Sequence, residues 1–182
     1  MRGRIVVAGL AGLLVSGCGA EAEPVAVPPP APIAVDVAAA SSGGACRLLD
    51  FTVIEQVVKV RFDVAAASER DDTYTCVLRA EGAALPELTL AVTETKIDKA
   101  TFGADMVPDK AAKVTGLGQQ AYRRTLAAAG GDGPVAEVGW LAGDGRMAEL
   151  TWTGGRGTER SAAEKRTADL IALAKKVDTR AL

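Results

Sequence analysis

The sequence predicts an α+β domain in which an antiparallel sheet of about five strands is covered by helices mainly on one face. Three observations support this fold class. Short segments within residues 74–152 alternate apolar and polar side chains, as half-buried strands do. Residues 161–177 carry apolar side chains at helical spacing, which predicts a C-terminal amphipathic helix. Helical patterns also precede and interrupt the strand patterns, an order that suits helices on one side of a sheet.

The first expected element is a short helix over residues 52–60. Thr52 and Glu55 have the spacing of a capping box, and apolar residues follow at helical intervals. Residues 63–73 are mostly polar or small, and we interpret them as a loop.

Alternating residues predict the first strands. Residues 74–79 form a strand with Cys76 on its inner face, and residues 88–92 form a second strand, paired antiparallel with the first. The next expected elements are a weaker helix over 97–106, a turn at 116–118, a third strand over 121–126 and a turn at 130–134.

A hairpin within residues 136–152 follows. Its two strands each carry an apolar set on one face, and a slip of one residue would turn a whole set to the other side. We therefore expect Trp140 opposite Leu150 and Val138 opposite Trp152. This register requires an odd loop around residues 144–146, such as a three-residue turn with a glycine-assisted bulge.

The C-terminal helix is expected to lie across the sheet. Ser161 and Glu164 match a capping box, in which each side chain satisfies a backbone N–H at the helix start. The apolar stripe comprises Ala163, Thr167, Leu170, Ile171, Ala174 and Val177.

Residues 1–17 have the features of a lipoprotein signal peptide. Arg2 and Arg4 precede an apolar stretch, residues 5–15, that is too short to span about 30 Å of hydrocarbon as an anchor. The stretch ends in Val15-Ser16-Gly17-Cys18, which resembles a lipobox. We expect Cys18 to become the first residue of the mature protein and to receive diacylglycerol and palmitate. These lipids should hold the chain on the extracytoplasmic face of the cell membrane. The alternative is an ordinary secretory signal followed by an incidental cysteine.

The rest of the chain divides into a tether and one domain. Residues 18–45 are rich in proline and alanine, a composition that favours an extended spacer over a core. A proline-rich motif that docks an envelope partner is the alternative. Residues 46–182 have the length of a single domain. Removal of residues 1–17 changes 21 basic and 23 acidic residues to 19 and 23, and the resulting negative charge argues against a nucleic-acid partner.

The two cysteines that remain after lipidation, Cys46 and Cys76, are expected to form a disulfide outside the reducing cytoplasm. Closing a loop of about 31 residues would stabilise the fold by roughly 3.7 kcal/mol in the chain-entropy model. Two free thiols are the alternative.

These features resemble a family of small actinobacterial lipoproteins that carry a two-cysteine domain of unknown function. The matching residues are Cys46-Arg47-Leu48-Leu49 after the tether, Tyr74-Thr75-Cys76, the segment from Gly116 to Tyr122, and the closing amphipathic helix. The resemblance spans most of residues 46–178, and it implies location and fold more than activity.

Several chemistries are excluded by composition. The chain has no histidine, which removes Ser-His and Cys-His nucleophilic pairs and the usual zinc sites. We expect no catalytic residue, no metal and no cofactor, and we interpret the chain as a non-enzyme. Asp71 and Asp72, with Glu69 nearby, could act as an acid–base pair or bind a cation, although a solvated loop explains them better.

Four residues are candidate ligand contacts. Arg156 and Arg160 flank the start of the C-terminal helix, where backbone N–H groups of a glycine-rich loop could hold an anion. Trp140 and Trp152 could line an apolar slot, although their strand phase favours packing in the core.

Three hypotheses for function remain. The leading one is a non-catalytic binding or accessory domain of the cell envelope, which presents a sheet surface or cleft to an envelope protein or small ligand. The alternatives are a carrier of lipid or another small apolar ligand, and an envelope hydrolase that uses carboxylates alone.

Overall fold

The computed structural model describes residues 42–182, which build one seven-stranded antiparallel sheet and the helices around it. The strands lie in the order β1-β2-β3-β7-β6-β5-β4 across the sheet. The α+β class and the antiparallel sheet are confirmed, but the sheet has seven strands rather than about five. The strands are β1 (Val64–Arg70), β2 (Thr73–Arg79), β3 (Glu87–Glu94), β4 (Ala112–Val114), β5 (Gln120–Leu126), β6 (Val135–Leu141) and β7 (Arg146–Thr153).

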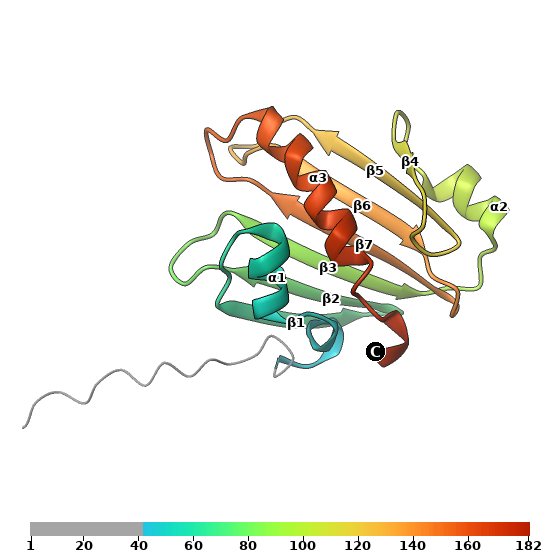
Figure 1. Ribbon diagram of the computed structural model, residues 1–182. Coiled ribbons are helices and arrows are strands. Elements are labelled where there is room, and N and C mark those ends of the chain that lie inside the picture. The colour runs from blue at the N-terminus through green and yellow to red at the C-terminus, as the bar shows by residue number, and fades with distance from the viewer. Residues whose placement is uncertain (1–41) are drawn as a thin grey trace, which may run out of the picture. The chain divides into compact units, whose positions relative to one another are not determined.

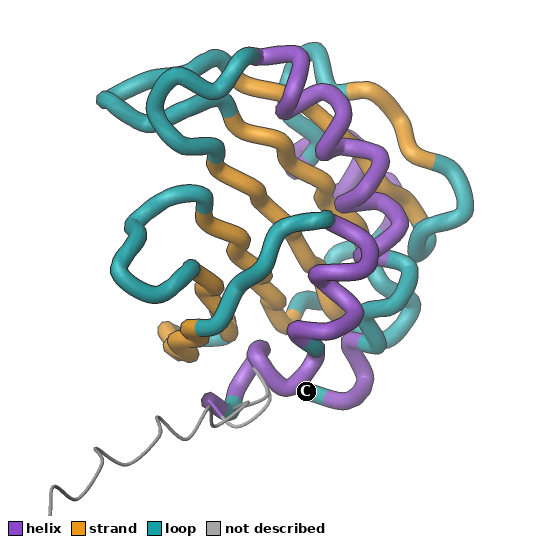
Figure 2. The backbone as a smooth tube through the Cα atoms, turned by 60° about the vertical axis from the view of Figure 1, so that its left-hand side comes forward, coloured by secondary structure: helices purple, strands orange, loops and turns teal. Residues whose placement is uncertain are grey.

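Helices α1 (Phe51–Val58) and α3 (Arg160–Ala174) lie on the same face of the sheet (Figure 1). Helix α3 packs on β5, β6 and β7 and also contacts α1, so the expected C-terminal helix across the sheet is confirmed. A second view shows α3 again running along one side of the strands (Figure 2). Within residues 42–182, no helix has both the length and the apolar character needed to cross a bilayer. The shorter helical segments are η2 (Gly44–Leu48), α2 (Lys99–Thr101), the π-helical turn η3 (Phe102–Met106) and η4 (Thr179–Ala181).

The main core lies between these two helices and the inner face of the sheet. Leu78, Leu90 and Leu150 occupy that face on β2, β3 and β7, and all three are fully buried. Ile54 of α1 and Leu170 of α3 close the core from the helix side. Because successive strand residues point to opposite faces, the residues next to these leucines lie on the second face of the sheet.

The two strands that the sequence analysis missed are β1 and β4. Residues 63–73 were expected to be a loop, but Val64–Arg70 pair with β2 along their whole length. Almost every side chain of β1 is exposed, because β1 is an edge strand. Ala65 is the one residue of β1 that packs against the main core, which is too little to impose apolar alternation, so the backbone ladder identifies the strand. β4 has three residues and is too short to show a pattern.

The β6–β7 hairpin confirms the predicted faces and corrects the predicted register. Trp140 lies opposite Ala148 and Val138 lies opposite Leu150, so the pairing is shifted by two residues from the prediction. The loop is odd, as expected, but it comprises residues 143–145, flanked by the bond from Ala142 N–H to Arg146 O. Gly145 has a φ of 78°, and a three-residue hairpin loop places its left-handed residue last. Because Gly145 must be the last residue of the loop, the loop is centred on residue 144, whereas the predicted register centred it on residue 145.

Both predicted capping boxes are wrong. Helix α1 begins at Phe51, one residue before the expected start, and Asp50 is its N-cap, with Oδ1 accepting from Val53 N–H at 2.9 Å. Thr52 therefore lies inside the helix. Helix α3 begins at Arg160, and its N-cap residue makes no side-chain cap bond. Ser161 is thus the second helical residue, where its side chain is past the capping position.

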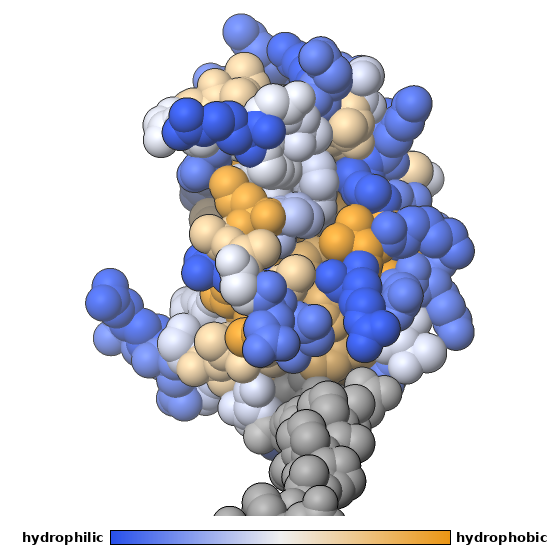
Figure 3. All heavy atoms as spheres, turned by 90° about the vertical axis from the view of Figure 1, so that its left-hand side faces the viewer, coloured by the Kyte–Doolittle hydropathy of each residue, from blue (hydrophilic) through white to orange (hydrophobic). Residues whose placement is uncertain are grey.

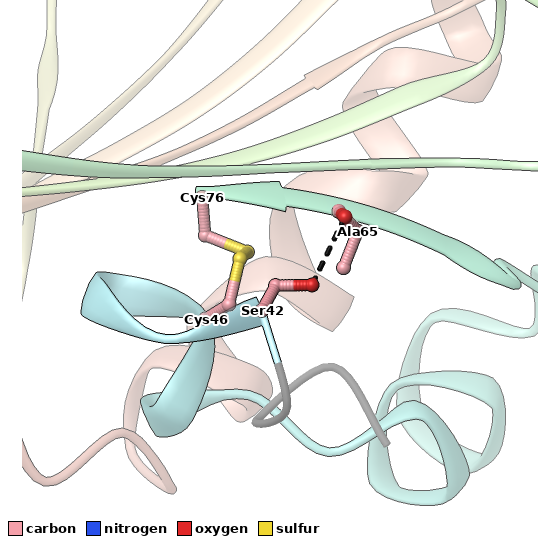
Figure 4. Close-up of a disulfide and its surroundings, with 4 residues drawn as sticks. All are labelled: Ser42, Cys46, Ala65 and Cys76. Atoms are coloured by element: carbon pink, nitrogen blue, oxygen red, sulfur yellow. Dashed lines mark hydrogen bonds between the residues drawn. A yellow bond between two sulfur atoms is a disulfide. The ribbon is translucent and has the colours of Figure 1, made fainter. Parts of the chain in front are cut away.

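The predicted Cys46–Cys76 disulfide is present (Figure 4). Both cysteines are fully buried, and their Cα atoms are 4.8 Å apart. The bond joins η2 to β2, next to a hydrogen bond from Ser42 Oγ to Ala65 O at 3.0 Å. The predicted signal peptide 1–17, Cys18 and nearly all of the predicted tether 18–45 lie outside the described residues.

Candidate functional site

The second face of the sheet is only partly covered. Over β2, β3 and β7 it carries small and polar side chains, mostly half-buried. We call this surface the open face. Its threonines are Thr73, Thr75, Thr89, Thr93, Thr151 and Thr153.

The loop after β3 covers the other part of the second face. Phe102 at the start of η3 packs against Tyr122 of β5, with ring centroids 6.3 Å apart, and Leu141 completes this small apolar cluster. The cluster borders the open face. Ionisable side chains gather at this border.

Four ionisable side chains from three adjacent strands meet there. Tyr122 and Arg124 come from β5, Glu137 from β6 and Glu149 from β7. The register places Gly139 between Tyr122 and Glu149. A Cβ atom at Gly139 would lie 2.5 Å from the Tyr122 ring, so only glycine leaves room for the ring to cross β6 and reach Glu149.

Glu137 is held on both carboxylate oxygens. Its side chain is 5% exposed, and Oε1 and Oε2 accept from Arg124 Nε and Nη2, each at 2.8 Å. The Tyr122 hydroxyl also lies 2.9 Å from Glu137 Oε1. This arrangement is a bidentate ion pair with its buried polar atoms satisfied, so Glu137 is a structural anchor for the site.

The Tyr122 hydroxyl also lies 3.0 Å from Glu149 Oε2. A hydroxyl has one proton, so it can donate to Glu137 or to Glu149 but not to both. Both contacts are satisfied together when Glu149 is protonated and donates to the tyrosine oxygen. Burial, followed by the charges of Glu149 and Glu137, raises the pKa of Tyr122 far above its ordinary value, so the hydroxyl keeps its proton.

The environment of Glu149 agrees with this protonated form. Burial is the largest cause that raises the pKa of Glu149, and the nearby charge of Glu137 adds to it. Hydrogen bonds from Tyr122 and Thr151 and the charge of Arg124 act in the opposite direction. The net effect is a carboxyl that holds its proton to higher pH than an ordinary glutamate does.

A pocket of about 310 Å³ opens beside Glu149. It combines apolar walls with the polar groups of the cluster, which is the usual composition of a small-molecule site. Met106, which is 38% exposed, stands at its rim. The lining residues are Ala91, Thr93, Met106, Pro108, Tyr122, Arg124, Gly139, Met147, Ala148 and Glu149.

The structure separates the four residues that the sequence suggested as ligand contacts. Trp140 and Trp152 are buried in the main core, at 2% and 4% exposed, and the guanidinium of Arg166 lies over the Trp152 ring. Trp140 also lines a depression of about 560 Å³ near the end of α3, together with Lys175.

The two arginines lie elsewhere. Arg156 is exposed in the loop before α3, and Arg160, the first residue of α3, forms an exposed ion pair with Glu164 at 3.4 Å. Asp71 and Asp72 form the turn between β1 and β2, and both are exposed. Within residues 42–182, no group of three or more histidine, cysteine or acidic side chains is arranged to hold a metal ion.

Sequence reasoning missed the cluster of Tyr122, Arg124, Glu137 and Glu149. One signal was available: Glu137 and Glu149 stand inside strands whose neighbouring residues are mostly apolar. A charge inside a strand that borders a core needs a partner, so these positions indicate a polar network on the second face.

The chain matches no protein-family model, and no curated protein or solved structure shows significant similarity to it. The resemblance to two-cysteine actinobacterial lipoproteins therefore stays a prediction. Function is therefore inferred from the residues and geometry of the site itself.

Proposed function

We propose that this chain is a membrane-anchored extracytoplasmic lipoprotein whose domain is a non-catalytic binding module, with its ligand site in the pocket beside Glu149. The lipobox at Cys18 supports the anchor. A disulfide between Cys46 and Cys76 suits an oxidising compartment outside the cytoplasm. The observation that carries the binding role is the Glu149 carboxyl, which faces a pocket on the open face and is held by Tyr122.

The cluster favours binding over catalysis. A hydrolase that uses carboxylates alone as acid and base needs two carboxyl groups that reach the substrate. Both oxygens of Glu137 are engaged by Arg124, and Glu149 is the carboxyl that lines the pocket. Asp71 and Asp72 are exposed in the β1–β2 turn, which gives them neither burial nor a positioned partner for such chemistry.

The pocket also favours a ligand with a polar group over a bare acyl chain. Arg124, Glu149 and Thr93 line it together with Met106 and Met147. Burying an acyl chain against these polar groups would remove their contact with solvent and offer no hydrogen bond in its place. A small amphipathic ligand can contact both the polar residues and the methionines of the pocket lining.

Anchoring is tested by labelled palmitate. The full-length chain should incorporate the label and fractionate with membranes, and Cys18→Ser should abolish both. Failure of the unaltered chain to take up label would contradict the anchor and leave the pocket as a separate question.

Ligand binding is tested by thermal denaturation of the full-length chain with a small-molecule extract of the cell envelope. We expect the extract to raise the Tm, because a ligand that binds only the folded state stabilises it. Ala91→Phe, which fills the pocket, should lose this shift, whereas Ala66→Phe, on the exposed β1 edge, should keep it. No shift in the unaltered chain, or an equal shift in Ala91→Phe, would contradict the proposed site.

A further inference from the structure

The charges of the cluster do not balance. Glu137 and Glu149 carry two negative charges when both are ionised, and Arg124 carries one positive charge. Because Arg124 is committed to both oxygens of Glu137, the uncompensated charge lies on Glu149. Tyr122 offers Glu149 a hydroxyl whose single proton Glu137 also accepts. The site therefore lacks one positive charge, which a proton on Glu149 supplies at pH values below the raised pKa of that carboxyl.

The pocket gives a second cation access to the same carboxyl. Glu149 and Arg124 are the charged side chains in its wall, and the guanidinium of Arg124 is neutralised by Glu137. Strand β3 contributes Ala91 and Thr93, and the segment after η3 contributes Pro108, so these elements bring no charge to the wall. Met106 and Met147 supply polarisable apolar surface beside the carboxyl.

From this geometry we infer that the pocket binds a small organic cation: a primary ammonium group on Glu149, with a short apolar body against Met106 and Met147. The inference rests on the proposed binding function and names its ligand class. A charge-assisted hydrogen bond between ammonium and carboxylate is among the strong ones, especially where water is partly excluded. Below the pKa of Glu149 the ammonium replaces the proton on Glu149, so binding there releases one proton and leaves the Tyr122 proton in place.

Proton competition fixes the sign of the pH dependence. The charged and titratable groups that face Glu149 are Tyr122, Arg124 and Glu137. Below the pKa of Glu149 the cation must displace a proton, so its apparent affinity should rise about tenfold per pH unit. Above that pKa the affinity should level off. A neutral ligand that accepts a hydrogen bond from protonated Glu149 would show the opposite trend.

The chain provides its own reporters for this test. It has three methionines, and signal-peptide removal takes away Met1, so Met106 and Met147 remain, both in the pocket wall. Full-length mature protein in detergent, labelled with ¹³C at the methionine methyl groups, is titrated with n-butylammonium, 1-butanol and butyrate. We expect butylammonium to shift both signals with the pH dependence above, and the other two probes to bind at least tenfold more weakly.

Two variants separate charge from shape. Glu149→Gln keeps the size of the side chain and should weaken butylammonium binding about ten- to hundredfold. Glu94→Gln removes a charge from the exposed end of β3 and should leave binding unchanged. The pH series on the unaltered protein needs no variant.

Three results would overturn the inference: equal affinity in Glu149→Gln, stronger binding of butanol or butyrate, or no shift with any probe. The envelope-extract assay tests the binding function separately, so the ligand class can fail while that function stands.

Discussion

Gly139 determines whether the site can form. Its missing side chain lets the Tyr122 ring cross β6 towards Glu149, and an added Cβ would meet ring carbons at 2.5 Å. The ring is held by Phe102 on one side and cannot move away freely. A glycine in a strand commonly marks such a close approach.

We therefore expect Gly139→Ala to destabilise the protein by about 1–3 kcal/mol, because the ring or the strand must shift. The measurement is urea unfolding at equilibrium. Gly143→Ala is the matched control, since nothing lies within 4 Å of a Cβ at Gly143, and its effect should stay within about 0.5 kcal/mol. Similar values for the two variants would show that the Tyr122 contact is unimportant.

The raised pKa of Glu149 makes the free energy of unfolding fall as pH rises. Burial raises its pKa in the folded state, so its contribution to stability is fully present below the pKa of the unfolded chain. That contribution is lost as pH rises through the folded pKa. Glu149→Gln cannot ionise, so the variant should gain stability relative to the unaltered protein as pH rises from about 4 towards 7.

Thermal unfolding of both proteins across this pH range checks the prediction. Glu94→Gln should follow the unaltered protein. If the stability of Glu149→Gln relative to the unaltered protein stays constant or falls as pH rises, a raised pKa at Glu149 is excluded.

The cluster could not be assembled from sequence because it depends on register. The predicted hairpin pairing would place Glu149 opposite Leu141, whereas the structure places it opposite Gly139. The prediction had the correct faces, since a shift of two residues preserves them. It nevertheless moved Glu149 two residues along β6, away from Tyr122. A site built from three strands can be predicted only if the register of each strand pair is correct. The alternation of apolar residues in the sequence determines which face a side chain lies on but not its position along the neighbouring strand.

At the scale of elements, prediction succeeded where a buried face imposes a pattern. β2, β3, β5, β6 and β7 each have a face in the core, and each was expected near its observed position. β1 fails this condition because it is an exposed edge, and β4 is too short. The helix starts were predicted from capping-box spacing alone. Spacing does not show which residue precedes the first helical turn, and α1 is capped by Asp50 instead.

The cap of α1 provides a direct comparison of two residues. Asp50→Ala removes the carboxylate that accepts from Val53 N–H, so the protein should lose about 1 kcal/mol of stability. Thr52→Ala lies within the helix and is exposed, so its effect should stay within about 0.5 kcal/mol. Urea unfolding distinguishes the two, and a larger loss for Thr52→Ala would restore the capping box predicted from sequence.

At the scale of the molecule, one covalent link ties the segment before α1 to the sheet. Cys46 and Cys76 are 30 residues apart and fully buried, and both lie in the main core. The surface in Figure 3 is mostly hydrophilic, with small separate apolar groups outside the atoms drawn in grey. The domain thus combines a disulfide-linked core with one partly open sheet face.

Replacing both cysteines with alanine should lower the free energy of unfolding by about 3.7 kcal/mol, because the unfolded chain regains the entropy of the open loop. Alanine avoids placing a hydroxyl in the core. Urea unfolding of the full-length chain provides the value. A change below about 1 kcal/mol would mean that closing this loop in the unfolded chain does not stabilise the fold.

The proposed site depends on the Glu149 carboxyl, which faces the pocket and keeps its proton to higher pH than an ordinary glutamate does. The most direct test is ¹³C NMR titration of the glutamate carboxyl groups in the full-length chain, with the Glu149 signal assigned by its absence in Glu149→Gln. We predict a titration midpoint for Glu149 above the ordinary glutamate value of about 4.3, because burial is the largest effect on the pKa of this carboxyl. A midpoint at or below the ordinary value would contradict the account.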